Sequence, residues 1–199
     1  MASPKIFLLS PADTKGVRAR RMCSPRANFP TARLYQSANG VPIGQAFSFM
    51  SGLYFRGKIA YAERFTAAPG VGGNSSIYVI APGFGLVPPD WLIDNRRMQR
   101  LRRIPVDPDS RAYRKPLEEH AMALAAKLPA ETSVVLLGSI ATGKYVDLLL
   151  PIFRDRLLFP RSFVGRGDMS RGSIMLAAAR TGEELEYMTF AARDREEGA

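Results

Sequence analysis

The sequence predicts an α/β fold with a mostly parallel central sheet. Short apolar runs that do not alternate with polar residues recur along the chain, as in strands covered on both faces. The clearest is Val134–Leu137, and Lys5–Leu9 and Ile77–Ile80 are similar. Segments between these runs place apolar residues at helical spacing. Strands that alternate with helices in this way are typical of α/β proteins.

The segment from residue 133 to residue 153 shows one strand, one loop and one helix in succession. Val134–Leu137 is followed by a loop bounded by Gly138 and Gly143, and apolar residues at helical spacing come after Lys144. Ligands of open α/β sheets bind beyond the carboxyl ends of the strands. We therefore expect Gly138, Gly143, Lys144 and Tyr145 to contact a ligand.

The length of 199 residues suits one domain. We expect a single α/β domain over residues 1–182 and a partly disordered C-terminal tail over residues 183–199. Further helices are expected at 47–65, 91–103, 112–128 and 173–180, with a short strand at 157–159. Residues 22–45 have no steady period and predict a long irregular loop.

The chain carries 28 Lys and Arg against 18 Asp and Glu, which gives a formal net charge of +10. Most of the basic residues are arginine, whose planar guanidinium pairs with phosphate through two hydrogen bonds. Two interpretations stay open. The arginines contact phosphate groups of a nucleic acid or nucleotide, or they are scattered over a solvated surface.

Composition also limits the location and the chemistry. No apolar run is long enough to cross a bilayer, and the apolar start of the chain is too short for a signal peptide. Cys23 and His120 are the only residues of their types, which argues against a disulfide framework, a transition-metal cluster and a Ser–His–Asp triad. We expect a cytoplasmic protein with no membrane partner, no metal and no cofactor, and we leave its oligomeric state open.

Candidate site residues follow the first two predicted strands. Ser10, Asp13 and Lys15 lie in a polar loop after Leu9, and Asp13 is the candidate for activating a water molecule. Phe84 and Asp90 lie in a glycine- and proline-rich loop after the second strand. The two glycines of that loop begin a dinucleotide-binding fingerprint, but a proline replaces the third glycine, so we reject that motif.

An arginine cluster lies in the expected helix at 91–103. Arg96, Arg100 and Arg103 fall on one face of such a helix. Like charges at this density repel each other unless an anion neutralises them. A contact with the phosphate backbone of a nucleic acid explains them, and a solvated basic face is the alternative.

A glycine-rich loop late in the chain carries Arg166, Asp168 and Arg171. Backbone amides and guanidinium groups together can hold an anion. Asp168 is a candidate either for orienting one of these arginines or for catalysis. We assign Arg166 and Arg171 to ligand binding.

The loop at 138–145 partly matches the phosphate-binding motif of nucleoside triphosphatases. Gly138–Lys144 fits G-x-x-x-x-G-K, but Tyr145 stands where a Ser or Thr should ligate magnesium. We therefore expect no magnesium-dependent triphosphatase. Phosphate binding by the amides of Gly143 and Lys144 does not depend on that hydroxyl and remains a hypothesis.

Several segments resemble, in order, a family of small uncharacterised bacterial proteins. The matching segments are Leu9–Pro11, Leu53–Lys58 with Ala60–Glu63, Tyr78–Ile80 with Gly85–Asp90, and Leu136–Gly138 with Tyr145–Leu149. That family is related to a domain of archaeosine synthase and of archaeal tRNA-guanine transglycosylase, and its fold resembles uracil-DNA glycosylase. The resemblance implies a three-layer α/β/α sandwich and a nucleobase, nucleotide or nucleic-acid ligand.

One departure from that pattern bears on activity. A uracil-DNA glycosylase typically has an Asp or Asn in its first motif and a histidine in a late loop. Asp13 could take the first place, but no late loop here holds a histidine. Arg166 or Arg171 would then have to stabilise the leaving base.

Three hypotheses follow for the function. The first is a protein of glycosylase-like fold that binds nucleic acid or a nucleotide and acts on a modified nucleobase by hydrolysing an N-glycosyl bond. The second is a small-molecule hydrolase or transferase that holds a nucleotide in the 138–145 loop. The third is a non-catalytic protein whose arginines bind an acidic partner. The first requires Asp13, Phe84, Lys144 and Arg166 to meet around one cleft.

Overall fold

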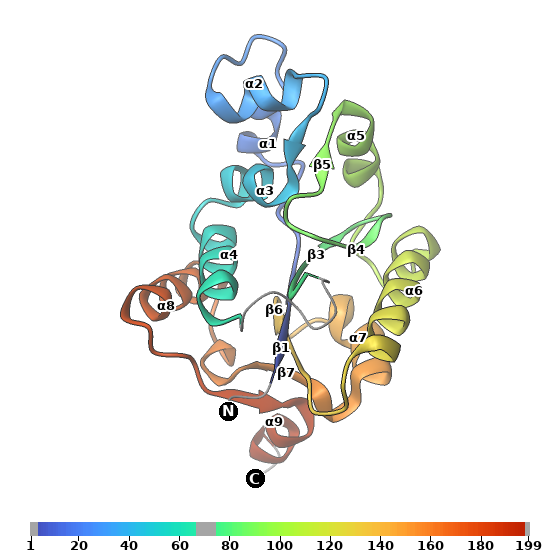
Figure 1. The fold of residues 1–199 in the computed structure, drawn as a ribbon, viewed down its shortest axis with the longest axis vertical. Helices are drawn as coiled ribbons and strands as arrows, with labels where there is room; N and C mark the ends of the chain where they lie inside the picture. The colour runs from blue at the N-terminus through green and yellow to red at the C-terminus, as the bar shows by residue number, and fades with distance from the viewer. Residues whose placement is uncertain (1–3, 67–74, 198–199) are drawn as a thin grey trace.

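The computed structural model describes residues 4–66 and 75–197 (Figure 1). Its strands are β1 (Lys5–Leu9), β2 (Val41–Pro42), β3 (Ile77–Ala81), β4 (Gly85–Val87), β5 (Leu92–Ile93), β6 (Ser133–Leu137), β7 (Leu157–Pro160) and β8 (Tyr187–Thr189). Its helices are α1 (Val17–Met22), α2 (Pro30–Gln36), α3 (Ile43–Ser51), α4 (Leu53–Phe65), α5 (Asn95–Arg103), α6 (Arg111–Lys127), α7 (Gly143–Phe153), α8 (Asp168–Thr181) and α9 (Phe190–Glu197). Two 3-10 turns, η2 (Arg154–Arg156) and η3 (Arg161–Phe163), flank β7.

The central sheet has six strands in the order β4-β3-β1-β6-β7-β8. β1 runs parallel to both β3 and β6, and β6 runs parallel to β7. β4 and β8 are antiparallel strands at the two edges. The predicted α/β class with a mostly parallel sheet is confirmed, and its innermost strands are the unalternating apolar runs. Phe7, Leu8 and Leu9 of β1 are fully buried, as expected for a strand covered on both faces.

Helices cover both faces of this sheet. α4 and α8 pack together on one side, and α6 and α7 pack together on the other (Figure 1). The arrangement is compatible with a three-layer α/β/α sandwich. Helices α1, α2, α3 and α5 gather beyond the carboxyl end of β1, around the two-stranded ribbon β2-β5, and α9 lies at the opposite end of the molecule (Figure 1).

Two expectations about this end of the molecule were wrong. The single helix expected at 47–65 is two helices, because Gly52 adopts φ 60° and ψ −121°, a conformation open to glycine that ends α3 and starts α4. The irregular loop expected at 22–45 contains α2 and β2, and the buried ring of Tyr35 anchors α2 through a 3.1 Å hydrogen bond to Asn95. Long-range packing fixes both segments, which is why local periodicity missed them.

The sheet extends into the segment that we expected to be a tail. β8 pairs with β7 through residues 187–189, and the side chain of Phe190, at the start of α9, is buried. Residues 198 and 199 of that expected tail lie outside the described residues. None of the helices in the described part of the chain is long and apolar enough to cross a membrane.

α4 and α8 approach each other at two glycines. A Cβ atom added to Gly57 would lie 2.6 Å from the carbonyl oxygen of Gly172, and one added to Gly172 would lie 2.9 Å from the Cα of Tyr54. Both contacts are with backbone, which cannot rotate away. The distance between these helices therefore depends on the absence of two side chains.

We expect Gly57→Ala to lower the free energy of unfolding by roughly 2 kcal/mol in urea denaturation, because the methyl group pushes α8 away from α4. As a control, Gly167→Ala should change it by less than about 1 kcal/mol, since a Cβ there meets nothing within 4 Å. A Gly57→Ala protein more stable than the wild type would contradict this, because it would mean that alanine's helix propensity outweighs the contact.

Candidate functional site

The ends of β1 and β6 meet at Ser10 and Gly138. The amide of Ser10 donates a 3.2 Å hydrogen bond to the carbonyl of Leu137. A Cβ atom added to Gly138 would lie 3.0 Å from the Cβ of Ser10. The structure thus brings together the first residues of two loops that were predicted to bind a ligand.

A lysine that the sequence analysis did not select contacts Ser10. The Nζ atom of Lys58, on α4, donates hydrogen bonds of 2.6 Å to Ser10 Oγ and 3.0 Å to the Ser10 carbonyl. The Lys58 side chain is 1% exposed, and its Nζ lies 3.8 Å from the centroid of the Tyr54 ring. Burial is the main reason why the pKa of Lys58 is lowered to about 7. The negative charge of Asp168 opposes this shift, and the positive charge of Arg171 adds to it.

The position of Lys58 in the sequence contains a signal for its burial. It lies four residues after Tyr54 and three before Tyr61, so the three side chains share one face of the helix. A lysine on such a face is rarely buried unless it has a polar partner. The spacing could have indicated that Lys58 is buried, but its partner Ser10 is distant in the sequence.

Two tyrosines complete the surroundings of Ser10. Tyr54 and Tyr145 are buried, and both hydroxyls lie near the Ser10 side chain. Burial raises the pKa of Tyr54 to about 12 and also raises that of Tyr145, so both hydroxyls keep their protons at neutral pH. The side chains of Arg171 and Ser10 lie close enough to the Tyr54 hydroxyl to lower its pKa, but no hydrogen bond of full length and geometry joins it to a described residue.

Asp168 and Arg171, both predicted site residues, lie on α8 above this centre. The buried guanidinium of Arg171 donates hydrogen bonds of 3.3 and 3.0 Å to the carbonyl of Phe163, and its Nη1 lies 3.9 Å from the exposed carboxylate of Asp168. Arg171 therefore holds the turn before α8. Arg166 lies just before α8, is exposed and donates a 3.4 Å hydrogen bond to the hydroxyl of Ser170 on that helix.

A carboxylate of helix α7 itself lies beside the predicted phosphate loop, at the point where that helix begins. The space that a Cβ of Gly143 would occupy is taken by the carboxylate of Asp147. Lys144 is exposed, and its carbonyl accepts a 2.9 Å hydrogen bond from the hydroxyl of Tyr113. A negative charge is favourable at the N-terminus of a helix, and here a side chain of the same helix supplies one.

Asp13 and Lys15 form a local turn. Asp13 Oδ1 accepts a 2.8 Å hydrogen bond from the amide of Lys15, and its other oxygen would lie 3.0 Å from a Cβ on Gly16. Such a turn holds the loop that precedes α1. The Asp13 carboxylate thus has a structural task in the loop, and Asp90 is exposed.

The four side chains expected around one cleft have separate neighbours. No hydrogen bond or ion pair within the described residues joins any two of Asp13, Phe84, Lys144 and Arg166. Of the four, Phe84 is the one that lines a pocket with predicted nucleic-acid-binding residues.

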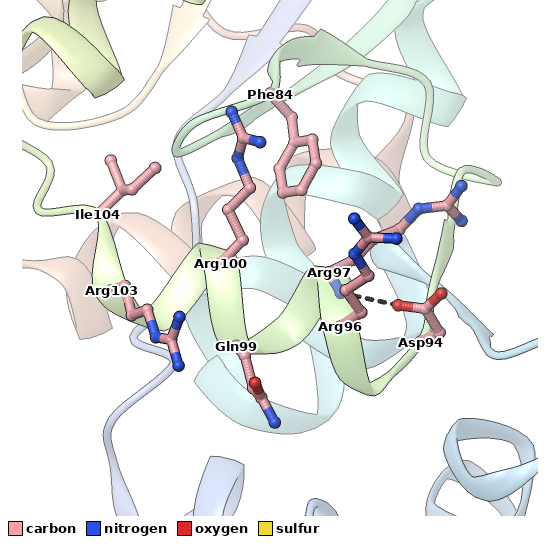
Figure 2. Close-up of a pocket in the computed structure, with 8 residues that line it drawn as sticks. All are labelled: Phe84, Asp94, Arg96, Arg97, Gln99, Arg100, Arg103 and Ile104. Atoms are coloured by element: carbon pink, nitrogen blue, oxygen red, sulfur yellow. Dashed lines mark hydrogen bonds between the residues drawn. The ribbon is translucent and has the colours of Figure 1, made fainter.

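That pocket, the α5 pocket, has a volume of about 580 Å³ and lies between the β3–β4 turn and α5 (Figure 2). It is lined by Phe84, Asp94, Arg96, Arg97, Gln99, Arg100, Arg103 and Ile104. Its single carboxylate is committed, because Asp94 caps the helix by accepting a 2.7 Å hydrogen bond from the amide of Arg97. The lining therefore presents four guanidinium groups and an aromatic ring.

Two of these arginines are held in place by aromatic rings. The guanidinium of Arg100 lies 4.9 Å from the centroid of the Phe84 ring and donates a 3.0 Å hydrogen bond to the carbonyl of Gly83. That of Arg97 lies 4.9 Å from the Trp91 ring, which itself packs 4.9 Å from Phe84. Fixed guanidinium planes and rings lose little conformational entropy when a planar ligand stacks on them.

A second basic pocket, the α1–α3 pocket, has a volume of about 570 Å³. It is lined by Arg18, Arg21, Thr31, Gln45, Ser48, Phe49, Gly52 and Arg56. Its aromatic lining residue is Phe49, which stacks on Phe29, and the guanidinium of Arg21 lies 5.7 Å from the Phe29 ring. Arginines beside an aromatic group therefore occur twice at this end of the molecule.

The sequence contained a charge signal for this end that composition alone did not show. Residues 14–62, which include α1 to α3 and α4 up to the residue before Glu63, contain eight Lys and Arg and no Asp or Glu. Residues 95–103 of α5 add five arginines and no acid. The net positive charge is thus concentrated around both pockets, which argues against a scattering over the whole surface.

No group of three or more His, Cys, Asp or Glu side chains within residues 4–66 and 75–195 could hold a metal ion. The imidazole of His120 lies on the backbone of Leu86, whose amide donates a 3.2 Å hydrogen bond to Nδ1.

We expect the stability of the wild type to rise with pH relative to that of Lys58→Met. The unfolded chain keeps its Lys58 proton up to pH 10.5, whereas the folded chain loses it near pH 7. Between these values the unfolded state binds more protons, so raising the pH favours the folded state by at most about 1.4 kcal/mol per pH unit. Denaturant unfolding of both proteins from about pH 7 to 9.5 tests this. A pH-independent difference between the two would contradict it.

Comparison with known proteins does not assign the chain to a family. It matches no protein-family model, no curated protein and no solved structure. The resemblance stated above therefore stays a prediction that rests on short motifs, and the function has to be argued from the geometry.

Proposed function

We propose that this protein binds single-stranded nucleic acid at its basic end, with the α5 pocket as the principal contact. One observation carries the proposal: four arginines and the ring of Phe84 line the same concave site. Proteins that bind single strands combine a positive groove for the backbone with aromatic or guanidinium planes on which unpaired bases stack. The α5 pocket offers both.

The individual side chains suit different parts of such a ligand. Arg97 and Arg100 are positioned by Trp91 and Phe84 and present flat surfaces for a base. Arg96 and Arg103 are exposed, with no hydrogen bond or ion pair in the described part of the chain, and can contact phosphates. A longer strand would also reach the α1–α3 pocket, which repeats the same chemistry.

The finer fold assignment belongs to this proposal. A three-layer sandwich that resembles uracil-DNA glycosylase is supported by the mostly parallel sheet and by helices on both of its faces. We limit the proposed function to binding. Hydrolysis of an N-glycosyl bond would need a carboxylate that activates water, and that of Asp13 already binds the amide of Lys15.

Fluorescence anisotropy with a labelled single-stranded oligonucleotide tests the proposal. We expect binding by the wild type that weakens as salt is raised, because phosphate contacts release counterions. The double variant Arg96→Ala/Arg103→Ala should reduce the salt dependence by about 1.4 in the slope of log K against log salt, at about 0.7 for each lost phosphate contact. Phe84→Leu should cost about 1–3 kcal/mol of affinity.

The matched control is Arg180→Ala, an exposed arginine on α8 that lines neither pocket. It should leave the affinity within about twofold of the wild type. Absence of binding at low salt, or an equal loss in the control, would refute the proposal. Tighter binding of a duplex or of polyglutamate would indicate general charge attraction, and stabilisation by free nucleotides alone would favour the small-molecule hypothesis.

A further inference from the structure

The geometry around Ser10 extends beyond nucleic-acid binding. Lys58 Nζ lies 2.6 Å from Ser10 Oγ, at the carboxyl end of the central strand β1. A neutral amine in this position can accept the Ser10 proton through its lone pair while one N–H bonds to the Ser10 carbonyl, 3.0 Å away. A serine hydroxyl becomes a good nucleophile when such a base adjoins it.

The surroundings favour the neutral amine. Lys58 is fully buried, and the charged groups that act on it are Asp168 and Arg171 of α8, which oppose each other. Its other neighbours are the rings of Tyr54 and Phe55 and the Ser10 side chain, which also faces the Tyr145 hydroxyl. A buried ammonium is costly without a paired anion, so a large part of the Lys58 population is the free base near neutral pH.

The Tyr54 hydroxyl is a further polar group in the same place. It is buried and lies close enough to the side chains of Arg171 and Ser10 for both to lower its pKa, although no hydrogen bond of full length and geometry joins it to a described residue. A buried hydroxyl without such a bond costs about 1–3 kcal/mol. An acceptor atom of a ligand beside Ser10 would give this hydroxyl a well-formed hydrogen bond.

We propose that Ser10 is a nucleophile that accepts an acyl group from a small carboxylic ester, with Lys58 as general base and Tyr54 as hydrogen-bond donor to the oxyanion. Ser10 Oγ bonds to the carbonyl carbon as its proton passes to Lys58 Nζ. The carbon–oxygen bond to the alcohol breaks, and the alcohol leaves with the proton from Lys58. Water then attacks the Ser10 ester with the same base, which releases the carboxylic acid and restores the serine.

The burial of the centre limits the substrate. Ser10 is 3% exposed, and its neighbours Pro11 and Ser139 are half-buried. The carboxylate of Asp168, which acts electrostatically on Lys58 and Tyr54, is itself exposed. We therefore specify esters of short acids, which need the least displacement of the surrounding side chains.

A purely structural role for the lysine is the competing explanation. Lys58 would then only tie α4 to the end of β1, and its removal would alter stability without any effect on the chemistry of Ser10. The two explanations differ in one observable, the reactivity of the Ser10 hydroxyl, so the test measures that reactivity directly.

The full chain is incubated with p-nitrophenyl acetate, and the acetyl adduct is located by peptide mass spectrometry. We expect the adduct on Ser10 in the wild type, with a rate that rises with pH through a midpoint near 7. Ser10→Ala should abolish it, Lys58→Met should slow it by about 100-fold or more, and Tyr54→Phe should slow it by about 100-fold. The control Ser139→Ala, at the end of the neighbouring strand, should react as the wild type does.

The wild-type pH profile needs no variant, so the proposal stays testable if Lys58→Met does not fold. The proposal is overturned by the absence of a Ser10 adduct, by an adduct on Lys58 in place of Ser10, or by a rate that keeps rising only above about pH 9. A Ser10 adduct formed equally fast in Lys58→Met also overturns it. None of these outcomes bears on oligonucleotide binding, because the variants leave both basic pockets intact.

Discussion

The buried amine of Lys58 is the constraint on which much of this structure depends. Its long side chain has to reach the end of β1 from α4, and it is buried almost completely there. Hydrogen bonds from Nζ to Ser10 satisfy the amine, and the Tyr54 ring covers it. The helix that carries Lys58 also packs closely on α8, through Gly57 and Gly172. The packing of α4 and the hydrogen bonds of its buried amine therefore both depend on the carboxyl end of β1.

The charged residues are distributed unevenly over the molecule. Basic residues concentrate in the helices beyond the carboxyl end of β1, where no carboxylate occurs between Asp13 and Glu63. Such an imbalance costs stability through mutual repulsion. The structure relieves part of it by laying Arg97 and Arg100 against Trp91 and Phe84. Two further arginines of α5, Arg96 and Arg103, stay exposed with no hydrogen bond or ion pair within the described residues.

The sequence predicted the interior of this protein better than its site. The apolar run at residues 134–137 and the helix after it were correctly placed, because burial and local periodicity coincide there. Phe84 was predicted to bind a ligand, and the structure places it in the same pocket as the arginines of α5. Lys58 was missed, since its significance comes from Ser10, which lies 48 positions away. The phosphate motif at residues 138–144 matched in letters, and the structure places the carboxylate of Asp147 beside Gly143 at the start of α7.

The α1–α3 pocket and the Ser10 centre have no residue in common, but they depend on the same helices. The loop after Ser10 leads into α1, which carries Arg18 and Arg21 of the α1–α3 pocket, and α4 carries both Arg56 of that pocket and Lys58. A ligand that moved α1 or the start of α4 would therefore displace the groups around Ser10. The α5 pocket shares no lining residue and no helix with the Ser10 centre, and two of its arginines, Arg97 and Arg100, are held by Trp91, Phe84 and the backbone near them. Occupancy of the α5 pocket should leave Ser10 undisturbed, whereas occupancy of the α1–α3 pocket couples to it through shared backbone.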